Sequence, residues 1–388
     1  MRILFATTAG LGHFRPLVPF ANACRAAGHE VRVAAPGSFE EAVRREGFGF
    51  GPFGDRADKD IASLFARVRT ASFEDGHRLM FSEGLAIYAR AAVAGFADLV
   101  DSWQPNLIVR ETAELASAIV GADRGIPRAH VATGVLDLFE VLVDAASESI
   151  ASLTVDFGLA APTGPALFAS ETVLTLTPPS LDASNRPAHR YREVADDVTA
   201  DPAFDGLRPL VYMTFGSEAS GPGLFPALFA KAIGELATGG WRLLVTVGQN
   251  ADPAALGPLP DNVRVERWID QAAILPHVAV VVCHGGYGTV IGALRAGVPI
   301  VVVPLFSIGQ HENARRVHSS GAGISIGGPD RLSELRPAVT RVLAEPNFQL
   351  AARRIADEIR TLPPVADAVS LLNELARSEA GSGPRPGR

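Results

Sequence analysis

The stretch CHGGYGTV, residues 283–290, follows an apolar run and combines a histidine, three glycines and a threonine. Glycines let a backbone approach a ligand closely, and backbone N–H groups at a helix start favour an anion. Thr289 can add a hydroxyl group, and His284 can add a hydrogen bond or a partial positive charge. The glycines of this turn are Gly285, Gly286 and Gly288. The turn therefore suits a diphosphate, although an ordinary tight connection between a strand and a helix has the same pattern.

A second candidate lies near the start of the sequence, where TTAGLGHFRP, residues 7–16, places His13 after another apolar run. A neutral imidazole is well suited to take a proton from a hydroxyl group near pH 7. We therefore expect His13 to act as a general base at the end of the first strand. The alternative is a histidine at a helix start that contacts only solvent or a backbone group.

Neither turn matches a cofactor motif. After Gly10 and Gly12, a dinucleotide fingerprint would need a third glycine where Arg15 stands, and an acid where the second strand ends in AAP. A Walker loop, GxxxxGKS or GxxxxGKT, is absent from both turns. Asp58 and Asp60 could hold a divalent metal, but acids that open a helix also interact favourably with its dipole. The sequence predicts no cofactor and no metal.

The elements that must position these turns alternate between strands and helices. Runs of β-branched residues predict strands at residues 2–8, 30–36, 106–110, 128–133 and 172–177, and again at 209–215, 242–248, 262–267, 278–283 and 299–304. Helical stretches separate these runs. Two such sets in succession predict an α/β fold with two doubly wound parallel-sheet domains. Ligands of these sheets bind at the carboxyl ends of strands, which is where both turns stand.

The domain boundaries follow from the same alternation. The first domain is expected at residues 1–207, ending in a linker at about residues 180–207 that is rich in proline, aspartate and arginine. The second domain is expected at residues 208–363. A length of 388 residues agrees with two domains. Residues 381–388, GSGPRPGR, are expected to be a disordered tail.

Composition excludes several classes of partner. The net charge is -7 and no basic run is present, so nucleic acid is not an expected partner. No signal peptide and no apolar run of about 18 residues is found, so no membrane association is expected. The two cysteines, Cys24 and Cys283, have no disulfide or zinc spacing, which fits a reducing cytoplasm.

Residues 57–104 form a long helical excursion between two predicted strands. Its apolar residues include Phe65 and Phe81. One interpretation is packing in the core of the first domain, and the other is a wall of an apolar pocket for a hydrophobic ligand.

Three motifs taken together resemble the donor-binding signature of family 1 glycosyltransferases of the GT-B fold. They are WIDQAAILP (268–276), CHGGYGTVIGALRAGVPIVVVP (283–304) and GQHENARRV (309–317). The segment GLGHFRP (10–16) is similar to the acceptor-side motif of the same family. The likeness is greatest to bacterial enzymes that glycosylate natural products such as antibiotics.

This resemblance implies two facing Rossmann-like domains with a cleft between them. The first would bind the acceptor and the second a nucleotide sugar, and a final helix at about residues 364–380 would cross back to the first domain. It assigns donor contacts to Ser217, Trp268, Ile269, Gln271, His284, Gly285, Gly286, Gly288, Thr289 and Gln310. A hydrophobic small-molecule acceptor would contact Phe65, Phe81, Leu136 and Phe139, although core packing would use the same residues.

The resemblance also implies a mechanism. Family members pair the histidine with an aspartate after a later strand, and Glu111 stands at the matching place here, with Arg110 beside it. His13 would deprotonate a hydroxyl group of the acceptor, which would attack the anomeric carbon in a single inverting displacement. The helix start and His284 would stabilise the leaving diphosphate in place of a metal ion.

Two departures from the family pattern bear on the donor. Relatives that use uridine diphosphate sugars carry a glutamate for the ribose hydroxyls where this chain has Gly292, which favours a thymidine diphosphate donor. Relatives also carry an aspartate for sugar hydroxyls where this chain has Gly309, which favours a deoxysugar or indicates an impaired site.

Two other functions stay open from the residues alone. One is a nucleotide-sugar epimerase of the same fold, and the other is a non-catalytic partner protein that binds nucleotide. The sequence does not distinguish a monomer from a homodimer.

Overall fold

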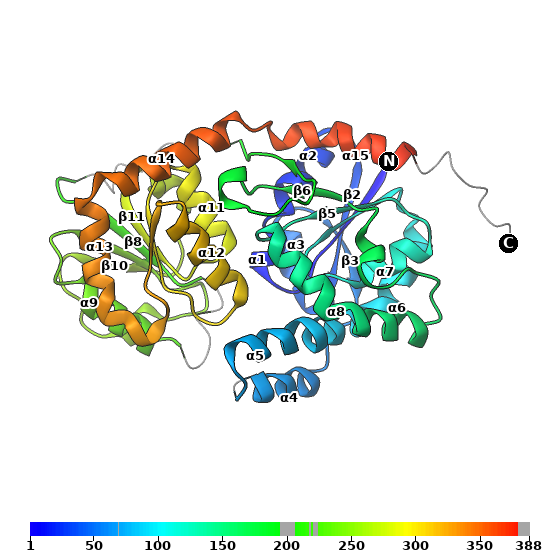
Figure 1. The fold of residues 1–388 in the computed structure, drawn as a ribbon, viewed down its shortest axis with the longest axis horizontal. Coiled ribbons are helices and arrows are strands. Elements are labelled where there is room, and N and C mark those ends of the chain that lie inside the picture. Colours follow the sequence, from blue (N-terminus) through cyan, green and yellow to red (C-terminus); the bar gives the residue numbers. More distant parts are fainter. Residues whose placement is uncertain (69, 195–205, 217–218, 220–223, 379–388) are drawn as a thin grey trace. The chain divides into compact units, whose positions relative to one another are not determined.

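A computed structural model describes residues 1–68, 70–194, 206–216, 219 and 224–378 (Figure 1). The chain divides into two compact units. The first comprises Met1–Leu176, Ser184–Glu193 and Pro363–Arg388, and the second comprises Thr177–Ala183 and Val194–Leu362. Ser217 and residues 381–388, for which the sequence made predictions, lie outside the described residues.

The first unit contains a seven-stranded sheet in the order β3-β2-β1-β4-β5-β6-β7. All neighbouring strands are parallel. The strands are β1 (Arg2–Ala6), β2 (Glu30–Pro36), β3 (Gly49–Phe53), β4 (Leu107–Glu111), β5 (Arg128–Val131), β6 (Thr172–Thr175) and β7 (His189–Arg190). The strand order reverses at β1, which pairs with β2 on one side and β4 on the other. Such a reversal is where open α/β sheets bind ligands.

The helices of the first unit are α1 (Leu11–Phe14), α2 (Val18–Ala26), α3 (Glu40–Arg45), α4 (Asp58–Val68), α5 (Phe73–Leu79), α6 (Leu85–Trp103), α7 (Ala116–Asp123), α8 (Leu136–Asp156) and α15 (Ala368–Ser378). Most of them pack around this sheet, but α4 and α5 lie away from it and pack against each other (Figure 1). The predicted excursion at residues 57–104 consists of α4, α5, a π-helical turn at Met80–Gly84, and α6.

Among the described residues, one helical stretch, Phe73–Trp103, is long and apolar enough to cross a membrane by length and composition alone, with an 18-residue window of mean hydropathy 1.2. Its second half, α6, buries one face that includes Ala92, Val93 and Phe96. These side chains pack with residues of β1, β4 and α7 in one hydrophobic cluster. Helix α6 is therefore a core helix of the first unit.

The second unit contains a six-stranded parallel sheet in the order β10-β9-β8-β11-β12-β13. Its strands are β8 (Leu210–Thr214), β9 (Arg242–Thr246), β10 (Val263–Glu266), β11 (Val278–Cys283), β12 (Ile300–Val302) and β13 (Gly323–Ser325). Its helices are α9 (Ala227–Leu236), α10 (Gln271–Ile274), α11 (Tyr287–Arg295), α12 (Ile308–Ser319), α13 (Leu335–Ala344) and α14 (Pro346–Thr361). The prediction of two doubly wound parallel-sheet domains is confirmed.

Sequence patterning missed three short strands, β3, β7 and β13. Strand β3 reads GFGPF and β13 reads GIS. Glycine and proline weaken an isolated strand, so these segments lack the run of β-branched residues that marked the others. Their pairing with neighbours, β3 with β2 and β13 with β12, makes them strands.

The first unit is completed from a distant part of the chain. The backbone N–H of Arg192 donates to the carbonyl of Pro363 at 2.9 Å, and that of Val365 donates to the carbonyl of Arg192 at 3.0 Å. Helix α15 then packs on α2, with Leu372 only 1% exposed. Thr177–Ala183 departs from the predicted boundary, because these residues pack with the second unit and Leu181 enters its core.

Candidate active site

His13 and Glu111 meet at the carboxyl edge of the first sheet. Strands β1 and β4 are parallel neighbours, with Ala6 opposite Arg110, so the segments that follow them leave the sheet side by side. His13 lies in α1, just beyond β1, and Glu111 ends β4. Nδ1 of the imidazole is 2.9 Å from Oε2 of the carboxylate. The side chain of His13 is 44% exposed and that of Glu111 is completely buried, so the imidazole can be reached by a substrate.

The Glu111 carboxylate is held by three further hydrogen bonds. Its Oε1 accepts from the backbone N–H of Thr8 at 3.2 Å and from the Thr8 hydroxyl at 2.9 Å, and its Oε2 accepts from the N–H of Ala113 at 2.6 Å. Burial alone would raise the pKa of Glu111, but His13 and these N–H donors outweigh it and hold the pKa below its usual range. The carboxylate is therefore a fixed acceptor for an imidazole N–H.

The side chain of Arg110, the residue before Glu111, points to the other face of β4. Successive side chains of a strand alternate between faces, so Arg110 lies opposite Glu111. It is fully buried and bonds Glu171 through Nε at 2.8 Å and Nη2 at 2.7 Å. The guanidinium is therefore paired with Glu171 on the face of β4 opposite to Glu111.

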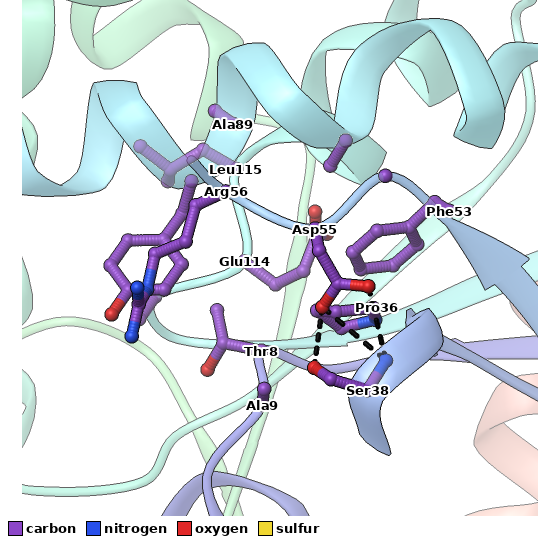
Figure 2. A pocket seen from close by; sticks show the side chains of 14 residues that line it. Thr8, Ala9, Pro36, Ser38, Phe53, Asp55, Arg56, Ala89, Glu114 and Leu115 are labelled. Atoms are coloured by element: carbon purple, nitrogen blue, oxygen red, sulfur yellow. Dashed lines mark hydrogen bonds between the residues drawn. The ribbon is translucent and has the colours of Figure 1, made fainter. Parts of the chain in front are cut away.

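A cavity of about 280 Å³ lies beside the residues that bond Glu111. Figure 2 shows the side chains that line it. The cavity is lined by the ends of β1, β2 and β3, by α6, and by the segment after β4: Thr8, Ala9, Pro36, Ser38, Phe53, Gly54, Asp55, Arg56, Tyr88, Ala89, Ala92, Ala113, Glu114 and Leu115. Two of these residues, Thr8 and Ala113, also bond Glu111. The cavity and the buried carboxylate therefore share a wall.

Apolar and polar groups both face this cavity. The Arg56 guanidinium lies 5.2 Å from the centre of the Tyr88 ring, and the Asp55 carboxylate accepts from the backbone N–H and hydroxyl of Ser38. Glu114 is 3% exposed and accepts from the N–H groups of Ala116 and Ser117, both at 3.0 Å. Burial raises the pKa of Glu114 to about 7, so this carboxyl is partly protonated near neutral pH.

None of the four residues predicted to contact an acceptor lines this cavity. Phe65 is 42% exposed on α4, and Phe81 packs against a core cluster. Leu136 and Phe139 are 0% and 2% exposed. The Phe139 ring packs against His130 and Phe168. Leu136 and Phe139 are packed in the core, which is the alternative that the sequence left open. Within the helical excursion at residues 57–104, it is α6 that lines the cavity.

The glycine turn of the second unit joins β11 to α11 and holds His284 against the sheet. Burial lowers the pKa of His284 to about 4, despite an opposing hydrogen bond to the carbonyl of Thr214. The imidazole is therefore neutral near pH 7 and can offer a hydrogen bond but no positive charge. A Cβ atom at Gly286 would lie 2.5 Å from Nε2 of His284, so the imidazole itself requires a glycine there.

The other two glycines of the turn differ in their surroundings. Gly285 has a φ of +85°, and a Cβ atom there would lie 2.7 Å from the carbonyl oxygen of Gln310. Gly288 is exposed, and an added Cβ atom would meet nothing within 4 Å in the described part of the chain. Thr289 is half-buried beside it. Open space therefore remains at Gly288, on the first turn of α11.

Helix α12 packs against this turn. The side-chain Nδ2 of Asn313 donates to the carbonyl of Gly285 at 2.8 Å, and Asn313 is buried. Gln310 uses its Oε1 to accept from the N–H groups of Leu305 and Phe306, at 2.8 and 3.0 Å. The Gln310 amide group is thus fixed in orientation by backbone contacts.

The remaining donor-side residues follow β10. Trp268 is 54% exposed, so one face of the indole can be reached by a ligand. Ile269 packs against the core of the second unit. Gln271 opens α10 and donates through Nε2 to the hydroxyl of Tyr212 at 3.2 Å.

Sequence reasoning missed four residues of the site, Thr8, Ala113, Glu114 and Asn313. Thr8 and Asn313 stand within motifs that were identified, but the patterns gave no reason to single them out. Ala113 acts through its backbone N–H, which no side-chain pattern can reveal. Glu114, three residues after Glu111 and before an apolar helix, carried a usable signal, because acids often bond the first N–H groups of a helix.

Comparison with known proteins agrees with this architecture. Sequence profiles described as erythromycin biosynthesis protein CIII-like match the chain in both halves, the N-terminal domain over residues 22–156 and the C-terminal domain over residues 231–375. The elloramycin glycosyltransferase ElmGT of Streptomyces olivaceus is 31% identical, over 96% of this chain and 97% of that protein.

Two solved structures have the same fold over nearly the whole chain. The glycosyltransferase SsfS6 of Streptomyces sp. SF2575, complexed with thymidine diphosphate, is 27% identical with a TM-score of 0.76, over 96% of this chain and 99% of that chain. The spinosyn rhamnosyltransferase SpnG, complexed with spinosyn aglycone, is 25% identical with a TM-score of 0.80, over 96% of this chain and 100% of that chain. The chain therefore belongs to the erythromycin biosynthesis protein CIII-like family of bacterial natural-product glycosyltransferases, which are family 1 enzymes of the GT-B fold.

Proposed function

We propose that this glycosyltransferase moves a deoxysugar from a thymidine diphosphate donor to a hydroxyl group of a hydrophobic small molecule, with inversion and without a metal ion or cofactor. The observation that carries the proposal is the 2.9 Å contact between the partly exposed His13 and the buried Glu111, beside a cavity of about 280 Å³. The complexes of SsfS6 with thymidine diphosphate and of SpnG with an aglycone support both substrate classes.

His13 is the general base of the proposed reaction. Nδ1 carries the proton shared with Glu111, so Nε2 takes the proton of the acceptor hydroxyl group. The acceptor oxygen attacks the anomeric carbon while the bond from that carbon to the diphosphate oxygen breaks. A single displacement inverts the configuration. Glu111 stabilises the imidazolium that forms and fixes the tautomer, as a buried carboxylate does for other catalytic histidines.

The donor diphosphate is proposed to bind at the turn before α11. Backbone N–H groups at the helix start face the leaving charge, and the neutral His284 contributes a hydrogen bond. Gly288, where space is open, allows the phosphate to approach the backbone. Trp268 would stack on the nucleobase, while Gln271, Thr289, Gln310 and Ser217 would contact the remaining polar groups.

The choice of donor is inferred from Gly292 and Gly309. Gly292 leaves no carboxylate for a second ribose hydroxyl, which favours thymidine diphosphate over uridine diphosphate. Gly309 leaves no acceptor for sugar hydroxyls, which favours a deoxysugar, because a buried unpaired hydroxyl costs about 1 to 3 kcal/mol.

The acceptor is proposed to enter the cavity beside Glu111. Phe53, Tyr88, Ala92 and Leu115 offer apolar contacts there, and Arg56 and Glu114 offer hydrogen bonds. This mixture suits a flat, mainly apolar molecule that carries several oxygen atoms.

The test replaces His13 by alanine. Loss of the base is expected to lower kcat at least about a hundredfold while thermal stabilisation by thymidine diphosphate stays unchanged. The matched control is His77→Ala, which removes a histidine of α5 and should leave kcat unchanged. Undiminished transfer by His13→Ala would remove His13 from the base role.

Two assays of the wild-type chain separate the remaining alternatives. Turnover of nucleotide sugar without an acceptor would support an epimerase and contradict the proposal. A thermal-shift panel of thymidine and uridine diphosphates should give the larger shift with thymidine diphosphate, and a clear uridine preference would overturn the interpretation of Gly292.

A further inference from the structure

A fully buried ion pair lies behind Glu111, on the opposite face of β4. The side chains of Arg110 and Glu171 are both 0% exposed, and the guanidinium bonds both carboxylate oxygens, at 2.8 and 2.7 Å. Glu171 immediately precedes β6, so the pair joins two strands that are not neighbours in the sheet. The rings of Phe139 and Phe168 lie 5.6 and 4.9 Å from the guanidinium carbon.

The third nitrogen of the guanidinium holds the segment that carries the catalytic carboxylate. Nη1 of Arg110 donates to the backbone carbonyls of Glu111 at 3.0 Å, Thr112 at 3.3 Å and Glu114 at 3.3 Å. One side chain therefore gathers three carbonyls of a four-residue turn, while its other two nitrogens are fixed by Glu171.

This turn determines where the Glu111 carboxylate lies. The N–H of Ala113, in the middle of the turn, donates to Oε2 of Glu111 at 2.6 Å, and the same oxygen contacts Nδ1 of His13. If the three carbonyls were released, Ala113 could move and that hydrogen bond would be lost. Arg110 therefore acts on the pair of His13 and Glu111 only indirectly, through the backbone of residues 111–114.

Stability does not by itself account for such a pair. Taking two charges out of water is costly, and replacing a buried pair by apolar side chains of similar volume is often neutral or stabilising. A guanidinium can donate hydrogen bonds to a carboxylate and to three carbonyls at once and so hold a turn in place, which apolar side chains cannot do.

We propose that Arg110, held by Glu171, is a positioning residue for the proposed catalytic pair, because it fixes the turn at residues 111–114 and thereby keeps the Glu111 carboxylate against His13. The inference rests on the proposed roles of His13 and Glu111.

The experiment compares Arg110→Met combined with Glu171→Leu, which removes both charges of the Arg110–Glu171 pair, with Arg128→Met as the matched control. Arg128 is also buried, lies 4.0 Å from Glu171, and donates to the carbonyl of Ala118 and to the hydroxyl of Ser170, whereas Arg110 donates to the 111–114 turn. The single variant Arg110→Lys retains the charge without the forked geometry and serves as a second probe.

The first readout is the pH titration of the His13 imidazole by NMR without substrate, with the signal assigned from His13→Ala. In the double variant and in Arg110→Lys, the titration midpoint should move by at least half of the change that Glu111→Gln produces, because a displaced carboxylate favours the imidazolium less. The kcat for transfer should fall about tenfold or more, with binding of thymidine diphosphate unchanged. Arg128→Met should change the melting temperature alone.

The inference would be overturned if the folded double variant or Arg110→Lys kept both the wild-type titration of His13 and the wild-type kcat. The Arg110–Glu171 pair would then have only a structural role. The titration measures the geometry of the His13–Glu111 pair without any turnover, so it tests the inference independently of catalysis. Failure of the proposed function would be seen separately, as sugar transfer that persists in His13→Ala.

Discussion

At the scale of single residues, Glu111 shows how a glutamate can bond a histidine at a place where family members carry the shorter aspartate. The side chain ends β4, is completely buried, and still reaches Nδ1 of His13 at 2.9 Å. Thr8 and Ala113 bond its two oxygens and remove the extra freedom of the longer side chain. The geometry of the pair is therefore set by neighbours of the carboxylate as much as by the length of its chain.

Replacing Gly292 by glutamate should shift donor preference. Among the described residues, a Cβ atom at this position would meet only Leu275 Cδ1, at 3.8 Å, so α11 has room there for a side chain. We expect Gly292→Glu to fold and to gain affinity for uridine diphosphate relative to thymidine diphosphate by about tenfold, through hydrogen bonds from ribose hydroxyls to a charged group. Isothermal titration calorimetry measures both affinities. Gly292→Ala is the control, and a folded Gly292→Glu with the wild-type preference would contradict the ribose argument.

Replacing Glu114 by glutamine should remove a pH dependence of stability. Burial raises the pKa of Glu114 to about 7 in the folded chain, so the folded state binds this proton more tightly than the unfolded state. The contribution of Glu114 to stability is therefore complete below about pH 4.5 and is lost as the pH rises to about 7, on the order of 3 kcal/mol in total.

The Glu114→Gln variant stays neutral throughout this range. Its free energy of unfolding in urea should exceed that of the wild type most at pH 8 and least at pH 5. Asp55→Asn removes the other acid of the cavity, which is exposed, and should leave the wild-type slope unchanged. Parallel curves for Glu114→Gln and the wild type would show that Glu114 ionises normally.

At the scale of elements, the connection between β11 and α11 combines two different uses of glycine. Gly286 makes room for the imidazole of His284, while an added Cβ atom at Gly288, on the first turn of the helix, would meet nothing within 4 Å among the residues that the structure describes. Asn313 of α12 ties the carbonyl of Gly285 to the next helix. The turn is thus held between β11, α11 and α12, and its open part, at Gly288, is where a phosphate could approach.

This difference predicts different effects of two similar substitutions. Gly286→Ala would place Cβ 2.5 Å from Nε2 of His284, so it should lower the melting temperature and weaken binding of thymidine diphosphate. Gly288→Ala should leave the melting temperature unchanged but weaken binding about tenfold, because the methyl group occupies space that the phosphate needs. Differential scanning fluorimetry with and without nucleotide measures both. Wild-type binding by Gly288→Ala would show that the diphosphate does not approach this position.

At the scale of the whole molecule, the chain passes between its two units more than once. Thr177–Ala183 packs with the second unit, Ser184–Glu193 returns to the first, and Pro363 onward returns to it again. A cut at a single residue would therefore leave one unit incomplete. The first unit depends on α15, whose Leu372 is buried against it.

Much of this architecture was predictable from local sequence. The five strands predicted in each half are all present, because buried parallel strands require continuous apolar runs that are visible without a structure. Strands β3 and β13 were not predictable, since their glycines and proline become a strand only when a neighbouring strand supplies the pairing.

The sequence by itself determined the two sheets and the two glycine turns, because strand patterning and turn chemistry are properties of adjacent residues. The pairing of His13 with Glu111 followed only from the resemblance to a family, since the two residues are 98 positions apart. Only the tertiary structure decided that Arg110 bonds Glu171, 61 residues away, that Phe139 packs in the core, and that His284 is neutral. The physical reason is that burial and charge pairing depend on which distant segments meet, and they set both the pKa of a group and the surface it offers to a substrate.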